Sequence, residues 1–239
     1  MDARQGQLEA GTILSGRYEL LAPLGQGGMG EVYEARDQST DERVAVKILR
    51  AEHAADDAMR RRFRREGAVL KALEHSGIVG LRELGVDDDG LVFLVTELVE
   101  GRTLRERLAL GPSVGLRETD RWVGPLCQAL QAAHAHGVVH GDLKPDNVVL
   151  VEASGGSVPR LLDFGASKVL GLDRLTATGE LAGTPAYMAP ELFIPRAELD
   201  VRVDVYGLGV LLYELLSGRN PFEDGHVGRV IRKVAAGDY

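Results

Sequence analysis

An α+β fold in two parts is predicted, with strands in the first part and helices in the second. Up to about residue 97, apolar and polar residues alternate with a period of two around glycine-rich turns, which is typical of strands. Beyond residue 101, longer stretches carry apolar residues at helical spacing. The chain has 239 residues and is 44% hydrophobic, which suffices for one large domain or two small lobes with a sizeable core. Residues 97–101 are predicted to join the two parts.

The predicted elements of the first part are a flexible leader (1–16), two strands around a glycine-rich turn (18–35), a third strand (44–49), a charged amphipathic helix (54–73) and a strand pair (78–98). The third strand is predicted because Val44, Val46 and Ile48 alternate with their neighbours. The strand pair is predicted because residues 87–90 are three aspartates and a glycine, a strong turn signal.

Two helices and a hairpin are predicted in the second part. Residues 119–136 form an amphipathic helix in which Cys127 is expected to be a small buried residue. Residues 148–162 form a hairpin around two glycines. Residues 205–216 are apolar almost all round, which predicts a buried helix.

Charge and composition argue against several function classes. The formal net charge of -8 and the pI of about 5.3 disfavour nucleic acid or an anionic membrane as the main partner. A single cysteine cannot form an internal disulfide, which fits a reducing compartment. No apolar run reaches transmembrane length, and residues 1–16 lack the apolar core of a secretory signal. We therefore expect no nucleic-acid partner, no membrane segment in this chain and a cytoplasmic location.

Five short motifs together indicate phosphoryl transfer. That reaction needs a phosphate cover, a lysine that pairs with the phosphates, magnesium ligands and a carboxylate at the attacking hydroxyl. Each motif is weak alone, whereas the order and separation of all five are specific. In chain order the motifs are Gly25-Gln26-Gly27-Gly28-Met29-Gly30-Glu31-Val32, Val44-Ala45-Val46-Lys47, His140-Gly141-Asp142-Leu143-Lys144-Pro145-Asp146-Asn147, Asp163-Phe164-Gly165 and Ala189-Pro190-Glu191.

The glycine motif and Lys47 are candidates for binding phosphates. The glycines lie between two predicted strands, whereas a dinucleotide-binding motif would run from a strand into a helix. Glycine lets the backbone approach a phosphate and point its N–H groups at it. Ala45 shares a strand face with Lys47 and leaves room for a flat base, and Glu66 is the candidate carboxylate that holds the lysine. The alternatives are a plain glycine-rich hairpin and a solvent-facing strand lysine.

The third and fourth motifs carry the candidate chemistry. Asp142 is placed to accept the proton of an attacking hydroxyl, and Lys144 can neutralise charge on the transferred phosphoryl group. Asn147 and Asp163 offer an amide oxygen and a carboxylate to magnesium, which prefers hard oxygen ligands. Taken alone, Asp163 is equally compatible with a turn residue before Gly165.

At these separations the motifs resemble the eukaryotic-type serine/threonine protein kinases, in particular their bacterial branch, from about residue 18 to the end. The resemblance implies a bilobal fold with an N-lobe at about 17–97 and a C-lobe at about 98–239 whose last helices are missing. It also implies ATP- and Mg²⁺-dependent transfer of the γ-phosphate to Ser or Thr hydroxyls of protein substrates in signalling. A homodimer that supports autophosphorylation is compatible with it.

The resemblance also assigns residues. Asp142, Lys144 and Asn147 are the catalytic residues that it implies, with Asn147 and Asp163 on magnesium. Asp204 is expected to brace the loop that contains Asp142. A hydrophobic stack is expected from Leu70, Leu81, His140 and Phe164. The residues implied to bind ATP are Leu24, Gly25, Gln26, Gly27, Gly28, Gly30, Val32, Ala45, Lys47, Glu66, the gatekeeper Thr96, the hinge residues Glu97 and Val99, Val149 and Asp163.

Two departures from the family pattern keep other functions open. Gly141 stands where most members carry arginine, and small-molecule phosphotransferases of the aminoglycoside type often share the resulting His-Gly-Asp triplet. Against that class, residues 183–191 resemble the segment with which protein kinases bind a peptide substrate. The chain also stops at Tyr239, earlier than the family fold, which leaves a pseudokinase or scaffold fragment as the other alternative.

Overall fold

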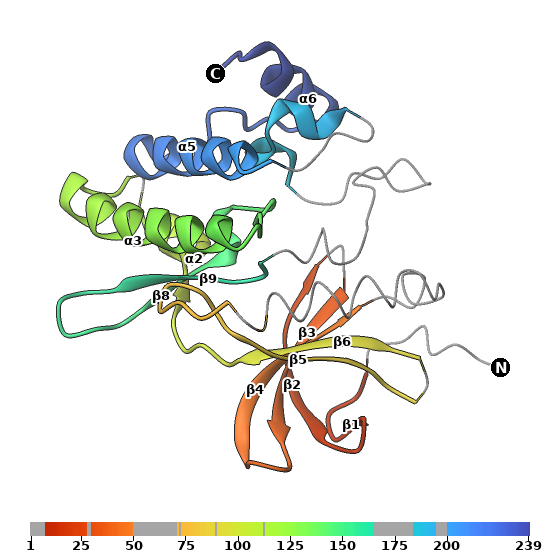
Figure 1. Ribbon diagram of the computed structural model, residues 1–239. Coiled ribbons are helices and arrows are strands. Elements are labelled where there is room, and N and C mark those ends of the chain that lie inside the picture. The colour runs from red at the N-terminus through yellow and green to blue at the C-terminus, as the bar shows by residue number, and fades with distance from the viewer. Residues whose placement is uncertain are drawn as a thin grey trace. The chain divides into compact units, whose positions relative to one another are not determined.

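The computed structural model describes residues 8–27, 30–49, 71, 73–88, 90–111, 113–164, 184–194 and 200–239 (Figure 1). The chain divides into two compact units. The first comprises Met1–Lys71 and Gly80–Leu98, and the second comprises Ala72–Val79 and Val99–Tyr239. Strands dominate the described part of the first unit. The helices α2, α3, α5 and α6 all lie in the second unit. The α+β prediction is confirmed. The helix predicted at 54–73 lies almost wholly outside the described residues.

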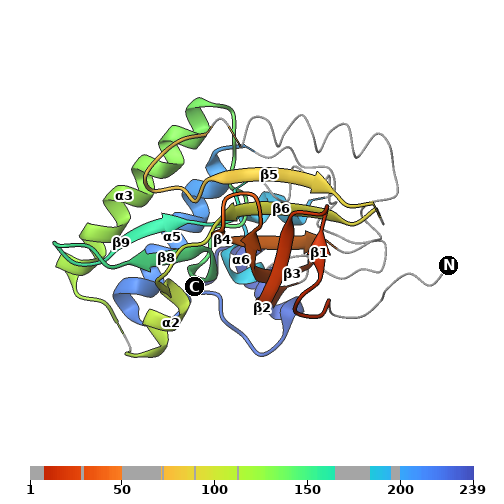
Figure 2. The same ribbon diagram turned by 90° about the horizontal axis from the view of Figure 1, so that it is seen from below.

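The first unit is a six-stranded antiparallel sheet with the strand order β1-β2-β3-β4-β6-β5 (Figure 2). Its strands are β1 (Ile13–Leu14), β2 (Tyr18–Gly27), β3 (Gly30–Asp37), β4 (Glu42–Leu49), β5 (Leu81–Val86) and β6 (Val92–Glu97). The strands predicted around the glycine-rich turn, at 44–49 and at 78–98 are therefore present. β1 lies inside the segment predicted as a leader and pairs with β2.

One face of this sheet forms a hydrophobic core. Successive side chains of a strand point to opposite faces, so the alternation of the sequence selects which residues are buried. In β4, Val44, Val46 and Ile48 are buried, whereas Ala45 and Lys47 on the other face are half-buried. The buried residues of the core are Leu14, Tyr18, Leu20, Tyr33, Ala35, Val44, Val46, Ile48, Phe93 and Val95.

The sheet curls until residues near its two edge strands meet. Arg17, between β1 and β2, donates to Glu83 of β5 at 3.0 Å, and the Tyr18 hydroxyl donates to the same carboxylate at 2.7 Å. The backbone N–H of Ser15 reaches Asp87 just after β5. Arg17 also donates from Nε and Nη2 to both carboxylate oxygens of the buried Asp37, at 2.8 and 2.6 Å. Arg17 thereby ties together three parts of the sheet.

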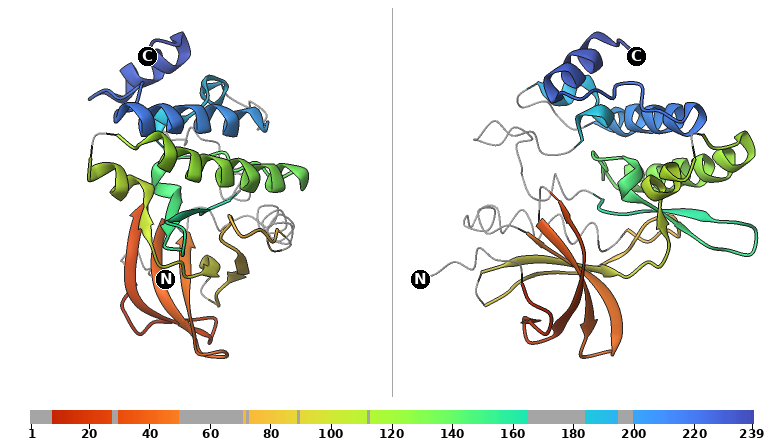
Figure 3. Two further views of the ribbon diagram at one scale, coloured as in Figure 1. Left: turned by 90° about the vertical axis from the view of Figure 1, so that its left-hand side faces the viewer. Right: turned by 180° about the vertical axis from the view of Figure 1, so that it is seen from behind.

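The second unit is built on helices, with one small sheet. Its elements are β7 (Arg102–Thr103), α2 (Leu104–Ala109), α3 (Leu116–Ala135), η2 (Pro145–Asn147), β8 (Val148–Val151), β9 (Val158–Leu161), η3 (Pro185–Tyr187), η4 (Pro190–Phe193), α5 (Arg202–Ser217) and α6 (Val227–Ala236). β7, β8 and β9 form a three-stranded sheet, which includes the predicted hairpin. α5 lies between α3 and α6 (Figures 1 and 3). None of the helices in the described ranges is long and apolar enough to span a bilayer.

The amphipathic helix forms much as its apolar spacing predicts. In α3, Trp122, Leu126, Leu130 and Ala133 are buried on one side. The Trp122 indole N–H donates to the carbonyl of Ser157 at 3.2 Å, which satisfies its polar atom inside the unit. Cys127 is exposed, so the prediction that it is buried is wrong. It falls on the solvent side because its angular position differs from that of Leu126 and Leu130.

The buried helix predicted at residues 205–216 is buried along one side only. Two of the apolar residues of α5 are exposed, Val205 by 64% and Leu216 by 41%. The opposite side of α5 is covered, because Val203, Gly207, Val210 and Leu211 are buried. Composition alone cannot separate these two sides, since both are apolar.

Two glycine substitutions should have opposite effects on stability. A Cβ at Gly101 would lie 2.4 Å from the carbonyl oxygen of Leu150, so Gly101→Ala should lower the free energy of unfolding by about 1–3 kcal/mol through overpacking. A Cβ at Gly209, inside α5, would meet nothing within 4 Å. Gly209→Ala should therefore stabilise by about 1 kcal/mol through helix propensity. Urea unfolding followed by circular dichroism measures both, and equal effects would contradict the packing at Gly101.

The Arg17–Asp37 contact predicts a dependence of stability on pH. The hydrogen bonds from Arg17 hold the pKa of Asp37 well below its usual range. The stabilisation is therefore complete above the unfolded-state pKa of about 4 and is lost as the pH falls further. Asp37→Asn should unfold more easily than the wild type at pH 6 but lose less stability between pH 5 and pH 3. The exposed Asp120→Asn is the control, and parallel pH profiles of stability for the wild type and Asp37→Asn would refute the effect.

Candidate active site

A fully buried carboxylate fixes the loop that carries the third motif. Asp204 lies in the first turn of α5 and has no exposed surface. Its Oδ2 accepts from the backbone N–H of His140 at 2.9 Å, and its Oδ1 accepts from that of Gly141 at 2.7 Å. The ring Nε2 of His134, at the end of α3, lies 2.7 Å from Oδ2. The prediction that Asp204 braces this loop is confirmed.

Three of the predicted site residues meet in this loop. Lys144 Nζ donates to Asp142 Oδ2 at 2.9 Å. The Asn147 amide Nδ2 donates to the carbonyl of Asp142 at 2.7 Å and to its Oδ2 at 3.1 Å. Pro145 begins the short η2 helix that returns the chain from Lys144 to Asn147. The carboxylate of Asp142 is thus oriented by a cation and an amide, and 24% of its side chain stays exposed.

His140 links this loop to Asp163 and Phe164. Its ring Nδ1 accepts from the backbone N–H of Asp142 at 3.2 Å, so Nε2 carries the proton and donates to the carbonyl of Leu162 at 2.9 Å. The ring also packs edge-on against Phe164, with centroids 4.7 Å apart. This is the His140–Phe164 part of the predicted hydrophobic stack. The backbone φ of Asp163 is +56°, a conformation that few residues other than glycine adopt.

In the first unit, strand register gathers the predicted ATP residues on one face. Residues opposite one another in an antiparallel pair project to the same side of the sheet. The register places Gly25 opposite Val32 and Val32 opposite Lys47. Ala45, two residues from Lys47, lies opposite Thr96 of β6. These five residues therefore share the face that the hydrophobic core does not occupy. Because Lys47 is half-buried, it is not a solvent-facing strand lysine.

The remaining predicted site residues are spread over both units. Leu24 is 51% exposed on β2, and Val149 is buried on β8. Glu97, at the end of β6, accepts from the backbone N–H of Gly80 at 2.9 Å through Oε1. Val99 lies in the second unit, one residue beyond the boundary. Gly28, Glu66, Leu70 and Gly165 lie outside the described residues.

The structure adds a polar cluster that sequence reasoning missed. Arg105 of α2 donates to Glu214 of α5 at 3.0 Å and to the Tyr187 hydroxyl at 2.7 Å. The Tyr187 hydroxyl donates in turn to the Glu214 carboxylate. Arg105 Nε also lies 3.5 Å from a carboxylate oxygen of Asp146 in η2. Burial and the Glu214 carboxylate raise the pKa of Tyr187 far above its usual range, so it stays a donor. No spacing in the sequence connects these four residues.

α5 also makes a close backbone contact with the loop. A Cβ on Gly207 would lie 3.3 Å from both Cβ and the carbonyl oxygen of Leu143, and 3.6 Å from the carbonyl oxygen of Tyr187. The absence of a side chain at Gly207 thus lets the Asp142 loop and the segment of η3 approach the same helix. Asp204, Gly207 and Glu214 together make α5 the common support of these segments.

Comparison with known proteins agrees with this arrangement. The family model described as "Protein kinase domain" matches residues 18–236. The chain belongs to the protein kinase family. The kinase domain is 41% identical over 232 residues to serine/threonine-protein kinase PkaA of Streptomyces coelicolor, covering 91% of this chain and 42% of that protein. It is 39% identical over 214 residues to serine/threonine-protein kinase pkn2 of Myxococcus xanthus, covering 88% of this chain and 25% of that protein.

A solved structure shares the kinase fold. The crystal structure of the Mycobacterium tuberculosis PknI kinase domain matches with a TM-score of 0.71 and 32% identity, covering 92% of this chain and 81% of that one. The bilobal kinase fold that the motifs implied is therefore confirmed as the fold family. This chain spans between a quarter and about two fifths of the length of the two curated relatives.

Removing the Asp204 carboxylate should lower the free energy of unfolding of the second unit. Asp204→Ala leaves buried backbone donors at His140 and Gly141 without an acceptor, and such a loss costs about 3–5 kcal/mol. Asp200→Ala is the control, since its ion pair with Arg202 is exposed and should contribute at most about 1 kcal/mol. Chemical unfolding of both variants tests this, and equal losses would show that Asp204 is not the anchor.

Proposed function

We propose that this kinase domain transfers the γ-phosphate of ATP to serine or threonine hydroxyls of proteins, in a reaction that depends on Mg²⁺. The observation that carries the proposal is the Asp142 loop, where a lysine, an amide and a partly exposed carboxylate converge. The buried Asp204 holds the loop by accepting hydrogen bonds from its backbone. The names of the curated relatives, which are serine/threonine-protein kinases, support the same reaction class.

In the proposed reaction Asp142 accepts the proton of the attacking hydroxyl. Its carboxylate is the acceptor of two hydrogen bonds, from Lys144 and Asn147, which orient it without covering it. Lys144 can contact the transferred phosphoryl group while it remains beside Asp142, and so balance the charge that develops there. Phosphoryl transfer needs this positioning and charge compensation more than it needs covalent chemistry.

Asn147 and Asp163 fit the magnesium ligands of the proposal. Both hydrogen bonds of the Asn147 amide described above use Nδ2, which leaves Oδ1 as the atom for a hard cation. Among the described residues, no group of three or more His, Cys, Asp or Glu side chains is arranged to hold a metal. Magnesium in nucleotide sites usually takes one or two protein ligands and phosphate oxygens, so the donor pair suffices. When bound, Mg²⁺ would neutralise phosphate charge.

The first unit would bind the nucleotide. The face shared by Gly25, Val32, Ala45, Lys47 and Thr96 offers a lysine for the phosphates and small or apolar side chains for the base. Gly30, at the start of β3, has a φ of +152°, which residues other than glycine rarely adopt. Glu97 and Val99 follow along the chain as the proposed hinge.

The alternative functions have less support. The likeness to small-molecule phosphotransferases rests on Gly141, and its φ of +73° is by itself a sufficient reason for a glycine at this position. A pseudokinase would be expected to lack the lysine, the base or a metal ligand, whereas Lys47, Asp142, Asn147 and Asp163 are all present. We propose protein hydroxyls as substrates because the segment of η3 and η4 is anchored to α5 near the Asp142 loop by Tyr187.

Substitutions at the proposed base and metal ligand should separate chemistry from binding. Asp142→Asn should lower kcat by about 10²- to 10⁴-fold and leave the KM for ATP nearly unchanged, since a general base acts in the transition state. Asp163→Ala should nearly abolish Mg²⁺-dependent transfer. The exposed Asp120→Asn on α3 is the matched control and should behave like the wild type.

The measurement is the initial rate of phosphate transfer from γ-labelled ATP to casein, followed by phosphoamino-acid analysis. Wild-type rates in Asp142→Asn would overturn its role as base. Label on tyrosine, or transfer to an aminoglycoside but not to casein, would overturn the proposed substrate class.

A further inference from the structure

The segment of residues 8–12 is bound to the sheet of the first unit, and it reaches the same strand pair that carries the glycine motif. We call it the docking segment. Leu8 packs against the hydrophobic core of the sheet. Gly11 donates through its N–H to the carbonyl of Leu20, and Leu20 donates to the carbonyl of Thr12, both at 2.8 Å. The docking segment therefore has a defined position on β2, although it lies within the region that was predicted to be a flexible leader.

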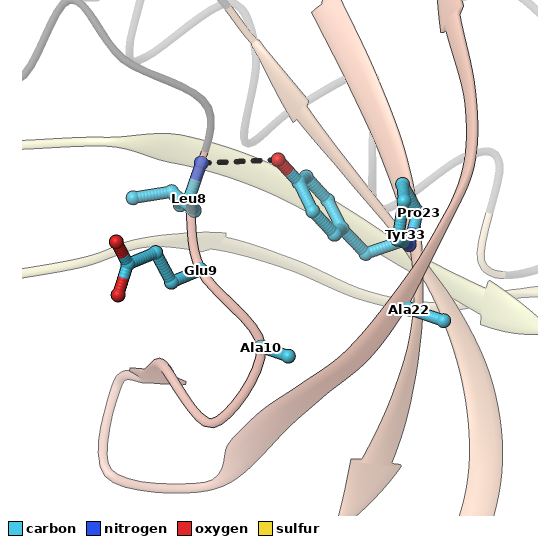
Figure 4. A pocket seen from close by; sticks show the side chains of 6 residues that line it. All are labelled: Leu8, Glu9, Ala10, Ala22, Pro23 and Tyr33. Carbon is cyan, nitrogen blue, oxygen red and sulfur yellow. Dashed lines mark hydrogen bonds between the residues drawn. The ribbon is translucent and has the colours of Figure 1, made fainter.

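A single side chain connects the docking segment to β3. The backbone N–H of Leu8 donates to the hydroxyl of Tyr33 at 3.1 Å (Figure 4). Tyr33 is only 2% exposed and its hydroxyl donates to the Glu31 carboxylate. Burial and that carboxylate raise the pKa of Tyr33 to about 12, so the hydroxyl keeps its proton. The Tyr33 hydroxyl therefore accepts a hydrogen bond from the docking segment and donates one to Glu31. Because a hydroxyl has a single proton, the bond to Glu31 uses its only donor.

Glu31 carries the connection onto the glycine motif. Its second carboxylate oxygen accepts from Nε2 of Gln26 at 3.1 Å. Gln26 lies between Gly25 and Gly27 and directly opposite Glu31 in the β2–β3 pair. A continuous chain of hydrogen bonds therefore runs from Leu8 through Tyr33 and Glu31 to Gln26, across the strand pair proposed to cover the phosphates.

The backbone ladder between β2 and β3 is irregular beside this chain of side chains. The β2–β3 register shifts twice, between Leu20 and Ala22 and between Pro23 and Gly25. A hollow of about 430 Å³ also separates the docking segment from Ala22 and Pro23, with Tyr33 in its lining (Figure 4). The two shifts of register and the hollow leave this end of β2 with fewer regular contacts to its neighbours. The side-chain contacts of Tyr33 therefore contribute more to holding this end of β2 in place.

We propose that Tyr33 and Glu31 are positioning residues for the glycine motif, and that the docking segment sets their orientation and thereby the affinity for ATP. The inference rests on the proposed function only in its last step, the effect on ATP. Loss of the docking segment would let the Tyr33 hydroxyl and the Glu31 carboxylate reorient, and Gln26 would lose its partner. The expected consequence is weaker nucleotide binding with unchanged chemistry at Asp142.

The test compares two buried tyrosines that make equivalent contacts at different places in the same sheet. Tyr33→Phe removes the hydroxyl that joins Leu8 to Glu31. Tyr18→Phe is the matched control, because its hydroxyl is also buried and donates to a carboxylate, that of Glu83, away from the glycine motif. Tyr33→Phe should raise the KM for ATP by about three- to tenfold, the worth of one or two hydrogen bonds, at constant kcat. Tyr18→Phe should leave KM unchanged.

Deleting residues 2–9 tests the contact that Leu8 of the docking segment makes with Tyr33. The deletion should raise KM as much as Tyr33→Phe does, and the double variant should be no worse than either single one, because both break the same chain of contacts. Fully multiplicative effects would overturn the coupling, as would equal KM changes in Tyr18→Phe and Tyr33→Phe.

A readout without ATP separates this inference from the proposed function. Hydrogen–deuterium exchange of peptides covering residues 22–33 should be faster in Tyr33→Phe and in the deletion than in the wild type and Tyr18→Phe. Unchanged exchange would overturn the inference whatever the kinetics show. Faster exchange in Tyr33→Phe and in the deletion, together with a wild-type protein that fails to bind ATP, would overturn the proposed function and retain the coupling.

Discussion

The buried carboxylate of Asp204 is the interaction on which the candidate site depends. A charge without exposed surface is stable only when donors surround it, and here the donors are the backbone of His140 and Gly141 and the ring of His134. These donors belong to the end of α3 and to the loop that follows, so one carboxylate joins two helices and the loop between α3 and β8. The loop is held by its backbone, which leaves the side chains of Asp142 and Lys144 available for chemistry.

α5 extends this role along its length. Gly207 lets the loop and the segment of η3 come close to the helix backbone, and Glu214 binds Tyr187 and Arg105 about two turns further on. α5 is a largely apolar helix whose few polar side chains hydrogen-bond to neighbouring segments, so it fixes the position of several loops at once. This explains why acidic residues occur in a segment whose composition resembles a plain core helix.

In the described part of the first unit, strand register sets the arrangement of the predicted ATP residues. The five residues proposed to face ATP come from four strands and share one face because they lie opposite or two residues apart from one another. The curled sheet keeps its core on the other face, where Arg17 and Tyr18 join β2 to β5. The docking segment lies on this sheet as well. Its connection to the glycine motif runs through the side chains of Tyr33, Glu31 and Gln26 and not through backbone hydrogen bonds between strands.

The sequence by itself determined the order of the elements, the family and the residue types of the site, because alternation, helical spacing and the five motifs are local signals. Only the tertiary structure decided that Arg105, Asp146, Tyr187 and Glu214 meet, and that Tyr33 joins Leu8 to Glu31. It also decided that Cys127 and one side of α5 are exposed. These features depend on which faces of distant segments pack together, and no short-range pattern encodes that choice.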